Sequence, residues 1–71
     1  MTNQMMLEKV IDQKGIKKAF LAEQLGISRM SLRNKISGKS EFKVSEMSRL
    51  QGLLNIDDAT ARDIFLSKDV N

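Results

Sequence analysis

The segment from residue 17 to residue 37 constrains the fold of this chain more than any other part. It reads KKAFLAEQLGISRMSLRNKIS. Near its middle, Gly26 can take the left-handed backbone conformation that ends a helix, and Ser28 is a residue type that caps the start of the next one. Apolar residues recur at helical spacing on both sides of this point. The segment therefore predicts two short helices that meet at a tight turn and lock together through Leu21, Ala22, Leu25, Ile27 and Leu32.

Length and composition restrict what can surround these two helices. A chain of 71 residues has room for one small domain with one core, expected to span residues 1–71. It has no cysteine, histidine or proline, so no disulfide, cofactor or metal site is expected. No apolar run is long enough to cross a bilayer, and the N-terminus lacks the pattern of a secretory signal, so we expect no membrane partner and a cytoplasmic location. Strand-like alternation is missing, which favours an all-α fold.

The apolar spacing predicts five helices, over about residues 3–14, 18–25, 29–36, 44–53 and 58–66, and a short polar tail over 67–71. Thr2 or Asn3 can cap the first helix and Asp57 the fifth, while Gly15 and Asn55 can end helices in the left-handed conformation. Outside the central segment, the residues expected in the core are Met6, Leu7, Val10, Ile11, Val44, Met47, Leu50, Leu53, Leu54, Ala61, Ile64 and Phe65.

Positive charge is concentrated around the central segment. Residues 14–43 contain eight basic and two acidic side chains, a net charge of +6, whereas residues 44–71 carry a net charge of −2. A basic patch of this kind attracts a phosphate backbone, and binding through it weakens as salt rises. The charge distribution therefore indicates a nucleic acid as partner.

The helix over residues 29–36 has the side chains needed to read base edges. Once its apolar residues face inward, the outward residues suit a major groove, because arginine can pair with guanine and asparagine with adenine. The predicted base contacts are Ser28, Arg29, Met30, Arg33 and Asn34. The predicted phosphate contacts, which position the protein without reading sequence, are Lys17, Lys18, Lys35, Lys39, Ser40 and Lys43.

A family resemblance rests on a longer set of residues: Leu21-Ala22, Leu25-Gly26-Ile27-Ser28, Leu32, Gly38, the spacing of Phe42, Glu46 and Leu50, then Leu53-Leu54-Asn55-Ile56 and Asp63-Ile64-Phe65-Leu66. On these, the chain resembles the lambda-repressor and Cro-like (XRE-type) helix-turn-helix family, especially small phage regulators, from Leu7 to Leu66. The resemblance implies a compact five-helix DNA-binding domain with the helix-turn-helix at its second and third helices. It further implies a regulator of the lysis–lysogeny switch, acting in the bacterial host on palindromic operators as a dimer. It assigns base contacts to Ser28, Arg29, Met30, Arg33 and Asn34 as well. It also places Lys18 where the family often has a phosphate-binding glutamine.

Departures from the family pattern keep a second interpretation open. Lys35 stands where an apolar residue is common and Ile36 where glutamate is common, so we expect Ile36 to pack and Lys35 to be exposed. We expect Phe20 to be buried and Met30 to meet a thymine methyl, but an exposed pair would suit a protein partner. The alternative is an antirepressor-like protein that binds a partner phage repressor. A weak homodimer through the fifth helix is also open, and the candidate partner interface is Phe20, Met30, Ile64, Phe65 and Leu66.

Residue types argue against an enzyme. Catalysis near neutral pH favours a histidine, a reactive cysteine or a pair of converging carboxylates, and the first two are missing. The neighbouring acids Asp57 and Asp58 are interpreted as residues that stabilise the N-terminus of a helix, where the helix dipole favours negative charge, rather than as a catalytic pair. No glycine-rich phosphate loop is present. We therefore expect a binding protein without catalytic activity.

Overall fold

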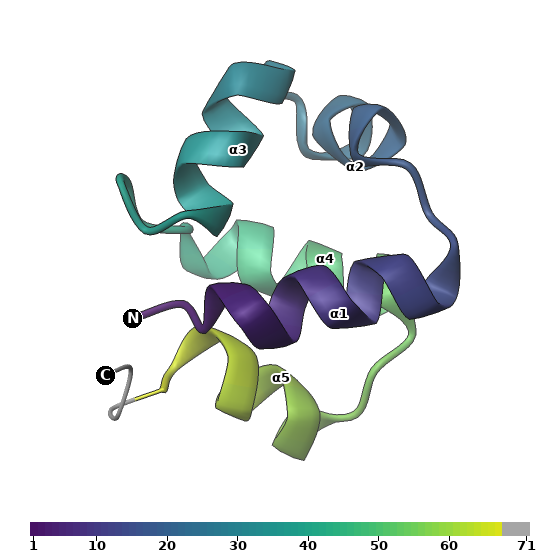
Figure 1. Ribbon diagram of the computed structural model, residues 1–71, viewed down its shortest axis with the longest axis vertical. Helices are drawn as coiled ribbons and strands as arrows, with labels where there is room; N and C mark the ends of the chain where they lie inside the picture. Colours follow the sequence, from purple (N-terminus) through teal and green to yellow (C-terminus); the bar gives the residue numbers. More distant parts are fainter. Residues whose placement is uncertain (68–71) are drawn as a thin grey trace.

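The computed structural model describes residues 1–67, and within them the chain is all-helical (Figure 1). The helices of this part are α1 (Gln4–Lys14), α2 (Lys18–Leu25), α3 (Arg29–Ile36), α4 (Val44–Leu54) and α5 (Asp58–Phe65). The prediction of an all-α fold is confirmed, and each helix begins and ends within one residue of the range expected from the sequence. Of the predicted polar tail, residues 68–71 lie outside the described part.

Short polar side chains begin three of the helices. The side-chain oxygen of Asn3 accepts a hydrogen bond from the N–H of Met6, at 3.1 Å, so the cap of α1 is Asn3 rather than Thr2. Ser28 caps α3 and Asp57 caps α5 in the same way, through the N–H groups of Ser31 and Thr60 at 3.0 and 2.7 Å. Each cap satisfies a backbone donor that has no partner inside the helix.

The turn between α2 and α3 depends on Gly26. Its φ of +71° lies in the left-handed region, where most other residues are strained. The next N–H, of Ile27, reaches back to the carbonyl of Ala22 at 3.0 Å. This bond closes the end of α2 and turns the half-buried Ile27 against the core. The chain then enters α3 at Ser28, after a connection of only three residues between the helices.

The helices pack with α2 and α3 at one end of the molecule and α5 at the other, and α1 and α4 lie between them (Figure 1). Each helix contributes at least one fully buried large side chain to a single core, which contains Leu7, Leu21, Leu32, Leu50, Leu54 and Ile64. The loop before α4 adds Phe42, whose ring meets that of Phe65 edge to face, with the ring centres 5.4 Å apart. The core therefore fixes both α3 and the loop that follows it.

Val44 is an exception to the predicted core, because 79% of its surface is exposed. The buried side of α4 carries Glu46, Leu50 and Leu54, which recur every four residues. Val44 is the first residue of the helix and falls away from that line. The expectation that Val44 is buried is wrong.

Candidate nucleic-acid interface

Packing of one side of α3 leaves its predicted base-contact side facing outward. Leu32 and Ile36 are buried against the core, at 1% and 2% exposure. On the other side Ser28, Arg29, Met30 and Arg33 are exposed, and Asn34 is half-buried. Arg29, Met30 and Arg33 line a shallow hollow of about 370 Å³. These side chains therefore form one surface, the α3 face, which is defined here as Ser28, Arg29, Met30, Arg33 and Asn34.

The arginines of the α3 face make no ion pair within the described residues, where the ion pairs are Lys18–Glu8 and Lys35–Glu46. An unpaired guanidinium keeps all of its N–H donors for an incoming ligand, in a planar fork that matches guanine or phosphate. The α3 face therefore presents two cations that can each make a bidentate contact.

Lys18, at the start of α2, lies beside this surface but is already paired. Its Nζ is 2.7 Å from Oε1 of Glu8 on α1, and the two side chains are 49% and 38% exposed. Both residues line a groove of about 250 Å³ between α1, α2 and α3, together with Arg29 and Arg33. Three of the four charged side chains that line the groove are therefore cations. Because the Lys18–Glu8 pair is exposed, Lys18 can leave the Glu8 carboxylate for solvent or for an anionic ligand.

The loop over residues 37–43 brings further polar and basic side chains to the end of α3. The carbonyl of Asn34 accepts hydrogen bonds from the N–H groups of Lys39 and Ser40, at 2.9 and 3.3 Å. These bonds fold the loop against α3, and Lys39, Ser40 and Lys43 are exposed. Lys17, which precedes α2, is exposed as well. Each of these four remains available for the phosphate contact predicted for it.

Lys35 is different. Only 8% of its surface is exposed, and its Nζ donates to Oε1 of Glu46 on α4 at 2.7 Å. The expectation of an exposed Lys35 that contacts phosphate is wrong, because its ammonium is buried against a carboxylate. Ile36 is buried as expected.

No role at this site was predicted for Glu46, although it contacts both Lys35 and the loop. Its Oε1 also accepts from the N–H of Lys43, at 2.8 Å. Burial opposes ionisation of the carboxyl, but the hydrogen bonds from Lys35 and Lys43 and the charges of those two residues outweigh it and hold the pKa of Glu46 below its ordinary value. A glutamate at the third position of a helix was a usable signal, since it commonly reaches back to the residue before the helix.

The candidate partner interface is divided by the structure. Phe20 is 46% exposed, so the expectation that it is buried is wrong; α2 turns Leu21 and Ala22 to the core instead. Met30 is exposed at 65%. Ile64 and Phe65 are buried in the core, at 0% and 3%, and their assignment to a partner interface is wrong.

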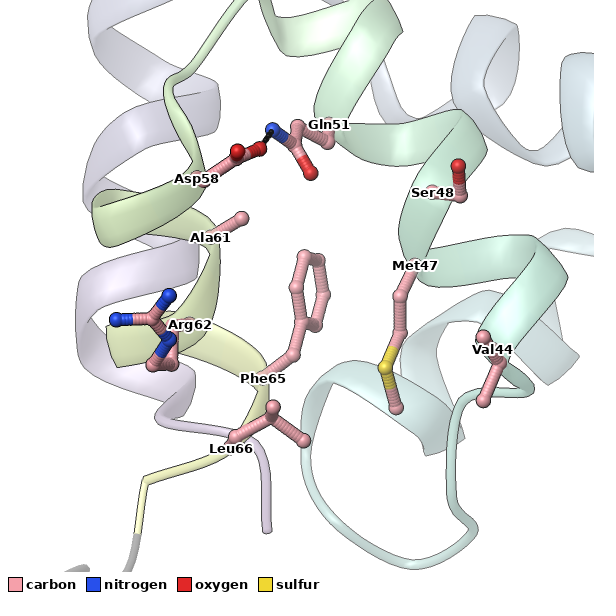
Figure 2. Close-up of a pocket in the computed structure, with 9 residues that line it drawn as sticks. All are labelled: Val44, Met47, Ser48, Gln51, Asp58, Ala61, Arg62, Phe65 and Leu66. Atoms are coloured by element: carbon pink, nitrogen blue, oxygen red, sulfur yellow. Dashed lines mark hydrogen bonds between the residues drawn. The ribbon is translucent and has the colours of Figure 1, made fainter.

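Of the α5 candidates, only Leu66 reaches solvent, with 58% of its surface exposed. It borders a groove of about 250 Å³ between α4 and α5, which Figure 2 shows. The ring of Phe65 lies between the two helices there, with Met47 facing it from α4. A hydrogen bond of 2.7 Å from Gln51 Nε2 to Asp58 Oδ1 bridges the helices beyond the ring. The groove is lined by apolar side chains together with Ser48, Gln51, Asp58 and Arg62, so its one cation is balanced by an acid, whereas the α3 face carries two cations and no acid.

Comparison of the chain with known proteins gives no match to a family model, to a curated protein or to a solved structure. Within residues 1–67, no helix has the length and apolar character needed to cross a membrane.

Proposed function

We propose that this chain is a small transcriptional regulator of the lambda-repressor and Cro-like kind, in which α2 and α3 form a helix-turn-helix and α3 enters the major groove of operator DNA. The observation that carries the proposal is the α3 face, where Arg29 and Arg33 project with no ion-pair partner among residues 1–67. Lysines at the start of α2 and in the loop after α3 flank that face on both sides. Base-reading arginines between phosphate-binding lysines are the arrangement that groove recognition requires.

Each residue of the α3 face has a role that suits its chemistry. Arg29 and Arg33 donate to O6 and N7 of guanine, and Asn34 pairs with adenine. Met30 packs against a thymine methyl, and Ser28 reaches a phosphate or a base edge from the N-terminus of α3, where free N–H groups favour an anion. The phosphate contacts are assigned to the exposed residues Lys17, Lys18, Lys39, Ser40 and Lys43.

The proposal assigns the protein a binding role with no catalytic step. As a phage regulator it would act in the cytoplasm of the bacterial host. One α3 face reads only one half-site, so tight binding to a palindromic operator requires two copies.

The test starts with selection of a binding site from a pool of randomised duplexes, followed by affinity measurements on the selected site. Replacing Arg33 with alanine should cost about 1–3 kcal/mol and relax the preference at one base position. Replacing Lys39 with alanine is the matched control, because it should weaken binding to all duplexes equally and lower the salt slope by about 1. Wild-type protein that selects no sequence would overturn the proposal.

A second candidate function is binding to a partner repressor, and the exposure of Phe20 favours it. A large aromatic side chain that is 46% exposed suits a protein contact better than a charged groove. The test is the affinity for a repressor encoded next to this chain, measured by calorimetry. Replacing Phe20 with serine should weaken that complex and leave DNA binding unchanged, and an unchanged complex would contradict this alternative.

A further inference from the structure

One carboxylate oxygen connects α3 to the start of α4. Oε1 of Glu46 accepts a hydrogen bond from Lys35 Nζ at 2.7 Å and another from the backbone N–H of Lys43 at 2.8 Å. The side chains of Lys35 and Glu46 are only 10% and 9% exposed. Within residues 1–67, this is the one side-chain hydrogen bond that joins α3 to α4.

The two donors belong to the two parts of the proposed DNA interface. Lys35 lies in the last turn of α3, two residues after Arg33. Lys43 ends the loop that carries Lys39 and Ser40. Glu46 therefore holds the helix assigned to base contacts and the loop assigned to phosphate contacts through the same atom.

Stability alone does not account for the buried Lys35–Glu46 pair. Removing two charges from water costs several kcal/mol per ion, so a buried ion pair is often no more stabilising than apolar side chains of similar volume. What it does supply is direction, because a charge-assisted hydrogen bond fixes both distance and angle. Apolar contacts tolerate repacking far better. A polar link buried between two recognition elements is thus suited to setting their relative position.

We propose that Glu46 is a positioning residue for DNA recognition, which acts through Lys35 to fix α3 in register with the loop over residues 37–43. In this register the base contacts of the α3 face and the phosphate contacts of the loop form at the same time. The inference rests on the proposed function, and its consequence is sequence discrimination rather than affinity for DNA in general.

The test uses the full chain with both partners replaced, K35M/E46M, because methionine is of similar length to lysine and glutamate and leaves no unpaired charge. We expect helical content and the free energy of unfolding close to those of the wild type. The affinity for the selected site should fall about tenfold, as if one base contact were lost, while the affinity for a scrambled duplex stays within about twofold. The matched control is Gln51→Met, which removes the exposed link between α4 and α5 and should leave discrimination unchanged.

A second variant, E46Q, covers the case in which the double variant does not fold. It keeps the shape and the acceptor of the side chain but removes the charge, and it should lower the ratio of the two affinities several-fold. Wild-type discrimination in every folded variant of Glu46 would overturn the positioning role. Failure of the wild-type protein to separate the selected site from the scrambled duplex would overturn the proposed function itself, so the two failures are distinguishable.

Discussion

Replacing Glu8 with glutamine should strengthen DNA binding. The Glu8 carboxylate lies 2.7 Å from Lys18 Nζ, in the groove that Arg29 and Arg33 also line. A phosphate that approaches Lys18 must displace this carboxylate and is repelled by it. Glutamine has nearly the same shape without the charge, so the substitution frees the ammonium while the groove keeps its form.

The expected gain follows from the exposure of the pair. With side chains 49% and 38% exposed, the pair has the character of a surface ion pair, which contributes about 0.2–1 kcal/mol. Under the proposed function, DNA binding by the wild-type protein would give up this amount, so E8Q should bind DNA about 1.5-fold to fivefold more tightly at low salt. A freed Lys18 also neutralises a phosphate more completely, which should steepen the slope of log affinity against log salt by up to about 0.9.

The assay is fluorescence anisotropy with a labelled duplex at several salt concentrations. The matched control is Asp63→Asn, which makes the same change in net charge on α5, where Asp63 is exposed and takes part in no ion pair of the described residues. Replacing Lys18 with alanine in both backgrounds completes a double-mutant cycle. The loss should be larger in the E8Q background, where Lys18 has no competing partner.

The reasoning is refuted if E8Q binds no more tightly than D63N, or if loss of Lys18 costs the same in both backgrounds. Either result would mean that Lys18 does not exchange Glu8 for phosphate. The groove between α1, α2 and α3 would then lie outside the DNA contact.

Three further predictions concern stability and are measured by urea denaturation. Replacing the buried Leu50 with alanine should lower the free energy of unfolding by about 3–5 kcal/mol, whereas the same change at the exposed Leu66 should stay within about 0.5 kcal/mol. Asn55 has a left-handed φ of +53°. Replacing it with alanine should lower the free energy of unfolding by about 1 kcal/mol, because alanine is strained at this φ, whereas replacing it with glycine should change the free energy of unfolding little. The pKa of Glu46 is lower in the folded protein than its ordinary value of 4.5. The ionised carboxylate therefore contributes fully to the free energy of unfolding above pH 4.5, and this contribution is lost as the pH falls through the folded pKa. E46Q should remove this part of the pH dependence of stability.

The helix ends were predictable because their signals act within a few residues. Ser28 caps α3 through an N–H three residues away, and Gly26 closes α2 through neighbouring carbonyls. Such contacts depend on the local chain and hardly at all on tertiary packing. The α3 face followed from the same local logic, since the positions of Leu32 and Ile36 determine which side of a short helix faces outward.

The errors arose where the type of a residue and its position on the helix indicated opposite outcomes. Lys35 shares the side of α3 that carries Leu32 and Ile36, at helical spacing, so the pattern alone indicated burial. Its charge favoured exposure instead, because a buried lysine needs a partner and that partner is eleven residues away on another helix. Phe20 shows the converse, since its aromatic character favoured burial while the phase of Leu21 on α2 turned it outward.

The two ion pairs of the described residues have the same N–O distance of 2.7 Å, yet their burial suggests opposite uses. Lys18 and Glu8 are largely solvated, so phosphate can replace the carboxylate at a cost below about 1 kcal/mol. Lys35 and Glu46 are nine-tenths buried, and breaking such a pair costs about 3–5 kcal/mol, more than one phosphate contact returns. Phosphate should therefore exchange with Glu8 and leave Glu46 in place. Under the proposed function, the exposed pair would tune how strongly DNA is held, and the buried pair would determine which bases the α3 face meets.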